Sequence, residues 1–191
     1  SQVEVHRDLA RTLFNVADAD IDNGMRHPSE LEASDPRRVM IHPTATRAGR
    51  MWSSSSFIRV AEGLQSRGFS PEFVTAPSEI ESTEWIERSG YPRLAVGDLD
   101  QVANRLAGSA AFVGNDSGIA HLSSSVGLPF VTVNVRRKLA IRWRPGWTNG
   151  EALTPSVPLL INPLKNRFWR NFISVNDVLS AFERVSDAPR R

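Results

Sequence analysis

The chain has 191 residues, enough to bury the core of one domain of ordinary size with extensions. Hydrophobic residues make up 40% and charged residues 23%, as in a globular protein, and no apolar run approaches the ~20 residues that a membrane-crossing helix needs. The absence of cysteine excludes disulfides and thiolate chemistry and fits a reducing compartment, and a net charge of +2 does not require a nucleic-acid partner.

The first part of the chain, residues 1–36, has the pattern of a helix followed by a linker. Val5, Leu9 and Leu13 recur at the spacing of one helical face between residues 3 and 15. The segment 17–36 is rich in Asp, Asn, Gly, Pro and Ser, which is typical of a connection, although an ordinary surface loop has the same composition. We therefore assign residues 37–191 to the main domain.

Short apolar runs predict five strands early in this domain. They lie at 38–42, 69–76 and 94–96, then just before Gly114 and just after Pro129. A helical pattern follows each of the first four. This alternation predicts an α/β fold, a Rossmann-like parallel sheet with helices on both faces. Ligands of such sheets bind outside the carboxyl ends of the strands.

The predicted helices have recognisable starts. Ser53 is expected to cap the first helix of the domain and Asp98 the third, because short polar side chains there accept a hydrogen bond from the first turn. The second helix is expected over 78–88. In the third, Leu99, Val102, Ala103 and Leu106 are expected to form one apolar face.

The turn Asn115-Asp116-Ser117-Gly118 between a strand and a helix is the most informative stretch of the chain. Asp116 is expected to cap the helix, whose first N–H groups and positive dipole end favour a phosphate. His121 lies one turn further on and forms a plausible ligand-contact pair with Asp116. A capped turn of this kind also occurs in many α/β proteins without any ligand.

A second loop, from Thr44 to Met51, follows the first strand of the domain. Arg47 and Arg50 on this loop would bring two guanidinium groups to a diphosphate. A solvated basic loop with no ligand has the same composition. Both loops lie at carboxyl ends of strands, where a shared binding site is expected.

Two motifs resemble glycosyltransferase family nine, the ADP-heptose:lipopolysaccharide heptosyltransferases. Residues 116–122, with 113–115 before them and 127–129 after them, resemble the family signature D-[ST]-G-x-x-H-L…G-x-P. Residues 41–45 with 50–52 resemble the family segment H-P-x-x…K-x-W. The two motifs stand in the right order and at a fitting separation, and the resemblance covers roughly residues 38–133.

The resemblance implies the carboxyl-terminal half of a GT-B glycosyltransferase, with a donor site on three loops. The donor-binding residues that it implies are Thr44, Arg47, Arg50, Glu79, Asp116, Ser117, Gly118 and His121. Arg50 replaces a lysine that contacts the nucleotide phosphates in the family, Glu79 would accept hydrogen bonds from the ribose hydroxyls, and Asp116 would bind the sugar hydroxyls. His121 would orient this cluster. The adenine is expected near the turn at 96–99.

The resemblance also implies a reaction, the inverting and metal-independent transfer of heptose from ADP-heptose to the lipopolysaccharide inner core. It implies a cytoplasmic bacterial enzyme that associates peripherally with the inner membrane and uses no cofactor. The acceptor site and the general base, which the sequence does not identify, are expected on an amino-terminal domain that does not precede Ser1. The chain alone is therefore expected to bind the donor without transferring the sugar.

Beyond Val133 the resemblance weakens. The run 142–147 combines Arg and Trp, which would suit a base, a sugar or a packed surface loop. A last strand is expected over 157–161, followed by a helix whose capping box runs from Ser174 to Asp177. Two other functions fit the sequence: a non-catalytic or degenerate module that binds nucleotide sugars, and a GT-B-related enzyme acting on UDP-sugars.

Overall fold

A computed structural model of the chain describes residues 2–14, 23–24, 34–135, 140, 144–155 and 168–187. Its centre is a six-stranded sheet in the order β3-β2-β1-β4-β5-β6, and every neighbouring pair is parallel. The strands are β1 (Arg38–His42), β2 (Ser70–Thr75), β3 (Arg93–Ala95), β4 (Ala111–Asn115), β5 (Phe130–Val133) and β6 (Gly150–Leu153). The predicted Rossmann-like sheet is thus confirmed.

The order of the strands reverses at β1, which lies between β2 and β4. The chain runs outward from β1 to β3 and then returns to add β4, β5 and β6 on the other side. In parallel α/β sheets, this switch point is where the connecting segments diverge and leave room for a ligand. A ligand site is therefore expected at the carboxyl ends of β1 and β4.

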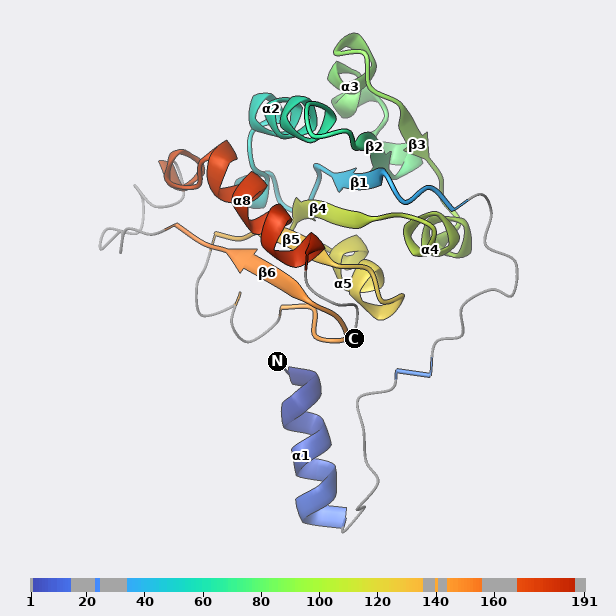
Figure 1. The fold of residues 1–191 in the computed structure, drawn as a ribbon, viewed down its shortest axis with the longest axis vertical. Helices are drawn as coiled ribbons and strands as arrows, with labels where there is room; N and C mark the ends of the chain where they lie inside the picture. Colours follow the sequence, from blue (N-terminus) through green and yellow to red (C-terminus); the bar gives the residue numbers. More distant parts are fainter. Residues whose placement is uncertain are drawn as a thin grey trace.

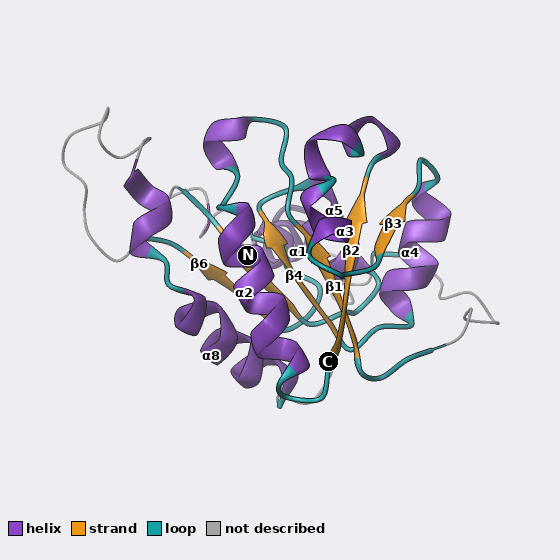
Figure 2. Ribbon diagram, turned by 90° about the horizontal axis from the view of Figure 1, so that it is seen from above, coloured by secondary structure: helices purple, strands orange, loops and turns teal. Residues whose placement is uncertain are grey.

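Helices cover both faces of the sheet (Figures 1 and 2). One face is covered by α2 (Ser54–Gln65) and α8 (Val175–Ser186), the other by α4 (Leu99–Ala107) and α5 (Gly118–Ser125). Along β1, Val39 and Ile41 face α2 and α8, whereas Met40 faces α4 and α5, because successive side chains of a strand point to opposite faces of the sheet. Burying a side chain of this size contributes about 1.5–3 kcal/mol.

The predicted helix over 78–88 is wrong. The chain forms the short turns η2 (Pro77–Glu79) and η3 (Glu81–Thr83) and then α3 (Trp85–Arg88). Side chains compete here with the helical backbone pattern, since the hydroxyls of Ser82 and Thr83 both donate to the carbonyl of Glu79. The interrupted segment leaves the Glu79 side chain beside the end of β2.

Three predicted caps are confirmed. Ser53 accepts from the Ser56 N–H at the start of α2, and Asp98 accepts from the Asp100 N–H at the start of α4. Ser174 and Asp177 form the reciprocal capping box at the start of α8. These local signals correctly mark where the helices begin.

The carboxyl-terminal part differs from the prediction in one strand. The strand expected over 157–161 lies outside the described residues, and β6 was not predicted. No β-branched residue marks β6, and Gly150 at its start is required by packing, since a Cβ there would lie 2.2 Å from the Phe130 ring. The described part of the Arg/Trp run packs against the end of α5, where the Trp147 N–H donates to the Ser124 hydroxyl at 3.0 Å. Arg142 and Trp143 lie outside the described residues.

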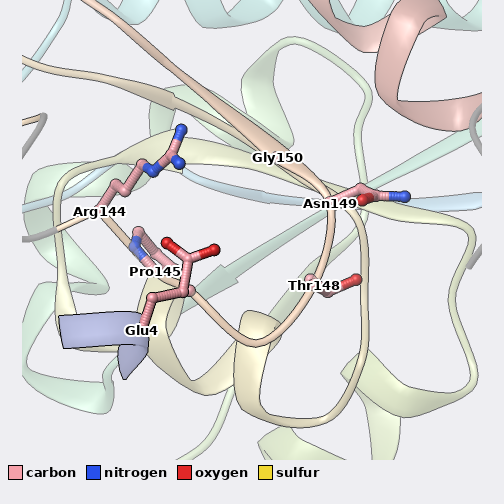
Figure 3. A pocket seen from close by; sticks show the side chains of 7 residues that line it. Glu4, Arg144, Pro145, Thr148, Asn149 and Gly150 are labelled. Atoms are coloured by element: carbon pink, nitrogen blue, oxygen red, sulfur yellow. The ribbon is translucent and has the colours of Figure 1, made fainter. Parts of the chain in front are cut away.

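The helix predicted at the amino terminus is α1 (Gln2–Phe14). It lies outside the two helical layers (Figure 1). The side chains of Val5, Leu9 and Leu13 on it are exposed. Its first turn borders a small pocket of about 130 Å³ beside the segment that leads into β6, where Glu4 approaches Pro145 (Figure 3). This pocket lies at the amino end of β6, away from the edge where ligands of such sheets bind. None of the described helices is long and apolar enough to cross a membrane.

Candidate functional site

A cleft of about 330 Å³ lies at the carboxyl edge of the sheet. Its walls come from the end of β1 and the loop after it, from the turn after β2, and from the first turns of α4 and α5. The lining residues are His42, Ala45, Thr46, Glu79, Leu99, Ser117, Gly118, Ile119 and Leu122. The cleft therefore occupies the topological switch point between β1 and β4.

The amino end of α5 opens into this cleft. Ser117 is the cap of the helix, with its hydroxyl accepting from the Ala120 N–H, and the predicted cap at Asp116 is wrong. The reason is that the Asp116 N–H still belongs to the sheet, where it donates to the Val133 carbonyl at 3.3 Å. A Cβ added at Gly118 would meet nothing within 4 Å, so open space lies directly over the first residue of the helix.

His42 and Thr44 form a buried pair beneath the cleft. His42 Nδ1 lies 2.8 Å from the Val74 carbonyl, which only accepts, so this nitrogen carries the proton. Nε2 of the neutral ring then accepts from the Thr44 hydroxyl, 3.2 Å away. The only proton of that hydroxyl is therefore directed at His42, which leaves the Thr44 oxygen as an acceptor.

Burial governs the ionisation of His42. Loss of solvation lowers its pKa below the ordinary value of 6.5, and the hydrogen bond to Val74 and the charge of Glu79 offset this only in part. The ring is thus neutral near pH 7, in agreement with its hydrogen bonds. Sequence reasoning placed His42 in a motif but did not predict that its side chain would line the site.

Acidification is expected to lower the free energy of unfolding through His42. The unfolded chain takes up a proton near pH 6.5, whereas the folded chain resists protonation to a lower pH, so stability is unaffected above that value and falls below it. Urea titrations between about pH 7.5 and pH 5 measure the effect. His42→Gln should flatten the profile, because it removes the group whose pKa differs between the folded and unfolded chain. Equal slopes for wild type and His42→Gln would contradict this assignment.

Glu79 and Leu99 form the far wall of the cleft. One carboxylate oxygen of Glu79, Oε2, accepts from the Ala76 N–H at 2.8 Å, which fixes the side chain and leaves Oε1 without a described protein donor. Leu99 is 63% exposed, although Val102 and Leu106 of the same predicted apolar face are buried. As the first residue of α4 it lies beyond the helical face that Val102 and Leu106 bury. It gives the cleft an apolar surface.

The predicted donor-binding residues fall into two groups. Glu79, Ser117 and Gly118 line the cleft, and Thr44 lies buried beneath it. The others do not line the cleft themselves: Arg47, Asp116 and His121 are each next in the chain to a lining residue, and Arg50 lies four residues beyond the lining Thr46.

The described residues around the cleft offer free positive charge but no cluster of metal-ligating side chains. Arg47 is exposed and Arg50 half-buried, and the guanidinium groups of both form no hydrogen bond or ion pair with any described residue. In the described part of the chain, no three His, Cys, Asp or Glu side chains come together as metal ligands would.

Solved structures of similar fold were found for most of the chain. E. coli ADP-heptose lipopolysaccharide heptosyltransferase II is 16% identical with a TM-score of 0.65, covering 96% of this chain and 51% of that chain. E. coli heptosyltransferase WaaC with ADP-2-deoxy-2-fluoro heptose is 20% identical with a TM-score of 0.67, covering 88% and 50%. The iron-containing dodecameric glycosyltransferase TibC from enterotoxigenic E. coli H10407 is 14% identical with a TM-score of 0.63, covering 86% and 49%.

At these identities the likeness shows the fold, and the chain spans about half the length of these structures. Comparison of the sequence with curated proteins gave no significant match. The model of one protein family, described as glycosyltransferase family 9 (heptosyltransferase), matches residues 1–149. This match covers both motifs and every predicted donor-binding residue, and the chain therefore belongs to glycosyltransferase family 9.

Proposed function

We propose that this chain binds the nucleotide-sugar donor of a family 9 glycosyltransferase and that the donor is ADP-heptose. The observation that carries the proposal is the cleft at the switch point, into which the open amino end of α5 projects at Gly118. We assign the three parts of ADP, namely the diphosphate, the ribose and the adenine, to different walls of this cleft. The WaaC structure, which contains an ADP-heptose analogue, supports the choice of donor.

The diphosphate is assigned to the start of α5. The N–H groups of Gly118 and Ile119 have no acceptor among the described residues, and the helix dipole favours negative charge at this point. The Ser117 hydroxyl accepts from the Ala120 N–H in the N-cap bond, so its proton can be donated to a phosphate oxygen. Arg47 and Arg50 lie on the loop whose residues Ala45 and Thr46 line the cleft, and they would supply positive charge to the phosphates.

The nucleoside is assigned to the opposite wall. The Oε1 atom of Glu79 suits the ribose hydroxyls, which donate to carboxylates. The exposed Leu99 side chain offers apolar surface to one face of an adenine, and burying it on a ligand is favourable. Asp116 would bind the sugar hydroxyls, and His121 would orient the cluster. The Thr44 hydroxyl would accept a hydrogen bond from the ligand, since its own proton is directed at His42.

For the whole protein we propose inverting heptose transfer to the lipopolysaccharide inner core without a metal, at the cytoplasmic face of the inner membrane. A general base on the other half of a GT-B enzyme would deprotonate the acceptor hydroxyl, which attacks the anomeric carbon as ADP leaves. The amino end of α5 and the two arginines would stabilise the charge that develops on the departing diphosphate. On this basis the chain alone binds the donor and does not transfer the sugar.

Calorimetric titration with ADP, UDP and ADP-heptose tests the donor assignment. In EDTA, we expect ADP to bind, the heptose to tighten binding, and UDP to bind about tenfold more weakly, because the exposed Leu99 side chain offers more apolar contact to a purine than to the smaller uracil ring. Equal affinity for UDP would favour a GT-B-related enzyme of UDP-sugars. ADP binding that heptose does not tighten would favour a nucleotide-binding module. A requirement for added metal would contradict the metal-independent mechanism.

A further inference from the structure

The loop between β1 and α2, residues 43–52, is tied down at both of its ends by one buried amide. Asn115 at the end of β4 donates from Nδ2 to the Pro43 carbonyl at 2.6 Å, and its Oδ1 accepts from the Trp52 N–H at 2.9 Å. Asn115 is fully buried, so these bonds are shielded from water. The loop that carries Arg47 and Arg50 therefore starts and finishes at fixed points.

The middle of this loop is held by a distant part of the chain, the turn η4 (Trp169–Phe172). Arg170 donates from Nε to the Met51 carbonyl at 2.5 Å and from a terminal nitrogen to the Ala48 carbonyl at 2.7 Å. Trp169, which is fully buried, donates from Nε1 to the Gly49 carbonyl at 3.0 Å. In return, Trp52 Nε1 donates to the Arg170 carbonyl at 3.2 Å. Within the described residues, four hydrogen bonds thus join this turn to the loop.

These bonds act on the short turn η1 (Ala48–Arg50), which has only the weak intrinsic stability of a single 3-10 turn. They engage the carbonyl groups of Ala48 and Gly49 in this turn and of Met51 after it, so donors from residues 169 and 170 compensate the partial negative charges of three carbonyls. Arg50 is the last residue of η1, and the place where its side chain leaves the backbone is therefore set by Arg170.

We propose that Trp169 and Arg170 are positioning residues for the phosphate-binding loop: they order residues 48–51 before the donor arrives, so that Arg50 and Arg47 meet the diphosphate without a further loss of loop entropy. This inference rests on the proposed function. Ordering a loop in advance raises affinity because the cost of fixing it is met during folding. Neither residue lines the cleft, and neither lies in the segment that matches the family.

Arg170→Gln tests the proposal, because it removes the charged fork while keeping a side chain of similar length. In the ligand-free chain, amide hydrogen exchange at Arg50 and Met51 should become about tenfold faster, since their N–H groups donate within η1. Affinity for ADP should fall about tenfold, whereas affinity for adenosine, which lacks the phosphates, should stay the same. Arg170→Lys should fall between wild type and Arg170→Gln, because an ammonium cannot reproduce the planar two-carbonyl contact.

Arg67→Gln is the matched control. Arg67 also donates to a backbone carbonyl, that of Gly63, and pairs with Glu183, but it lies beyond α2 and does not border the cleft. Its exchange and ADP affinity should stay within about twofold of wild type.

Two outcomes overturn the positioning role. Unchanged exchange at Arg50 and Met51 in Arg170→Gln would show that Arg170 does not order the loop, even if ADP affinity falls through a direct contact. Faster exchange with unchanged ADP affinity would show that loop order does not serve the donor. Failure of the wild-type chain to bind ADP would instead count against the proposed function, and the exchange comparison would still test the contact with the loop.

Discussion

Gly118→Ala is expected to weaken ADP binding by about tenfold or more while leaving the ligand-free chain at least as stable as wild type. Gly118 has no positive φ, and an added Cβ would meet no atom within 4 Å, so alanine fits the folded chain. As the first residue of α5 it would even benefit from the higher helix propensity of alanine, by up to about 0.5–1 kcal/mol. The new methyl group would instead occupy the space over the helix end that the proposal assigns to the diphosphate.

The size of this effect follows from the contacts that a methyl group would displace. A hydrogen bond between a backbone N–H and a charged group contributes about 1.5–3 kcal/mol, which corresponds to roughly 10-fold to 100-fold in affinity. Calorimetry with ADP and thermal unfolding without ligand measure the two quantities separately. Ser54→Ala, at the same first position of α2 and outside the cleft, is the matched control. Unchanged ADP affinity in Gly118→Ala would place the diphosphate elsewhere.

Glu72→Ala is expected to reduce the free energy of unfolding by about 3–5 kcal/mol, because it removes the carboxylate from a buried charge cluster. Glu72 on β2 is 9% exposed and Arg38 on β1 6%, and Arg38 Nε lies 3.4 Å from Glu72 Oε2. Arg105 on α4 adds a two-pronged contact, with Nε at 2.9 Å and a terminal nitrogen at 2.7 Å. Without Glu72, the buried Arg38 guanidinium loses this compensation. Urea unfolding at pH 7 measures the change.

Glu151→Ala gives the matched comparison for Glu72→Ala. Glu151 and Arg184 form the same two-pronged geometry, with both distances 2.7 Å, but at the surface. Solvent screens this pair, so its loss should change stability far less. Glu72 lies away from the cleft, so the folded fraction of Glu72→Ala should bind ADP like wild type. Similar destabilisation by the two substitutions would show that burial does not control the energy of the Glu72 cluster.

Much of the fold could be predicted from the sequence, because strands and helix starts depend on residues that are close together in the chain. Apolar runs and helical periodicity mark the five strands that were predicted, and Ser53, Asp98 and Ser174 mark helix starts, since each acts on a backbone N–H two or three residues away. The error at Asp116 has the opposite origin. Its N–H is engaged by β5, a partner distant in sequence, and this shifts the helix start to Gly118.

The candidate site depends more on contacts between distant residues, and there sequence reasoning was less complete. The motif drew attention to Ser117 and Gly118, and the family resemblance to Glu79, and all three line the cleft. The resemblance placed the adenine near residues 96–99, but the exposure of Leu99 was not predicted, because helical spacing alone cannot tell the buried part of an apolar face from a first residue that extends beyond it. The direction of the Thr44 proton depends on His42 and thus on Val74, and no local pattern encodes this chain of bonds.

The all-parallel pairing of the sheet also has a consequence for how the chain reaches its native state. Parallel neighbours cannot be joined by a tight hairpin, so each pairing must wait for a long crossover to close. Asn115 meets Pro43 across 72 residues of chain, and Trp169 meets Gly49 across 120. Loop-closure entropy grows with such separations. We therefore expect the contacts of residues 169 and 170 with residues 48–51 to form late in folding, after the strands that flank the switch point have paired.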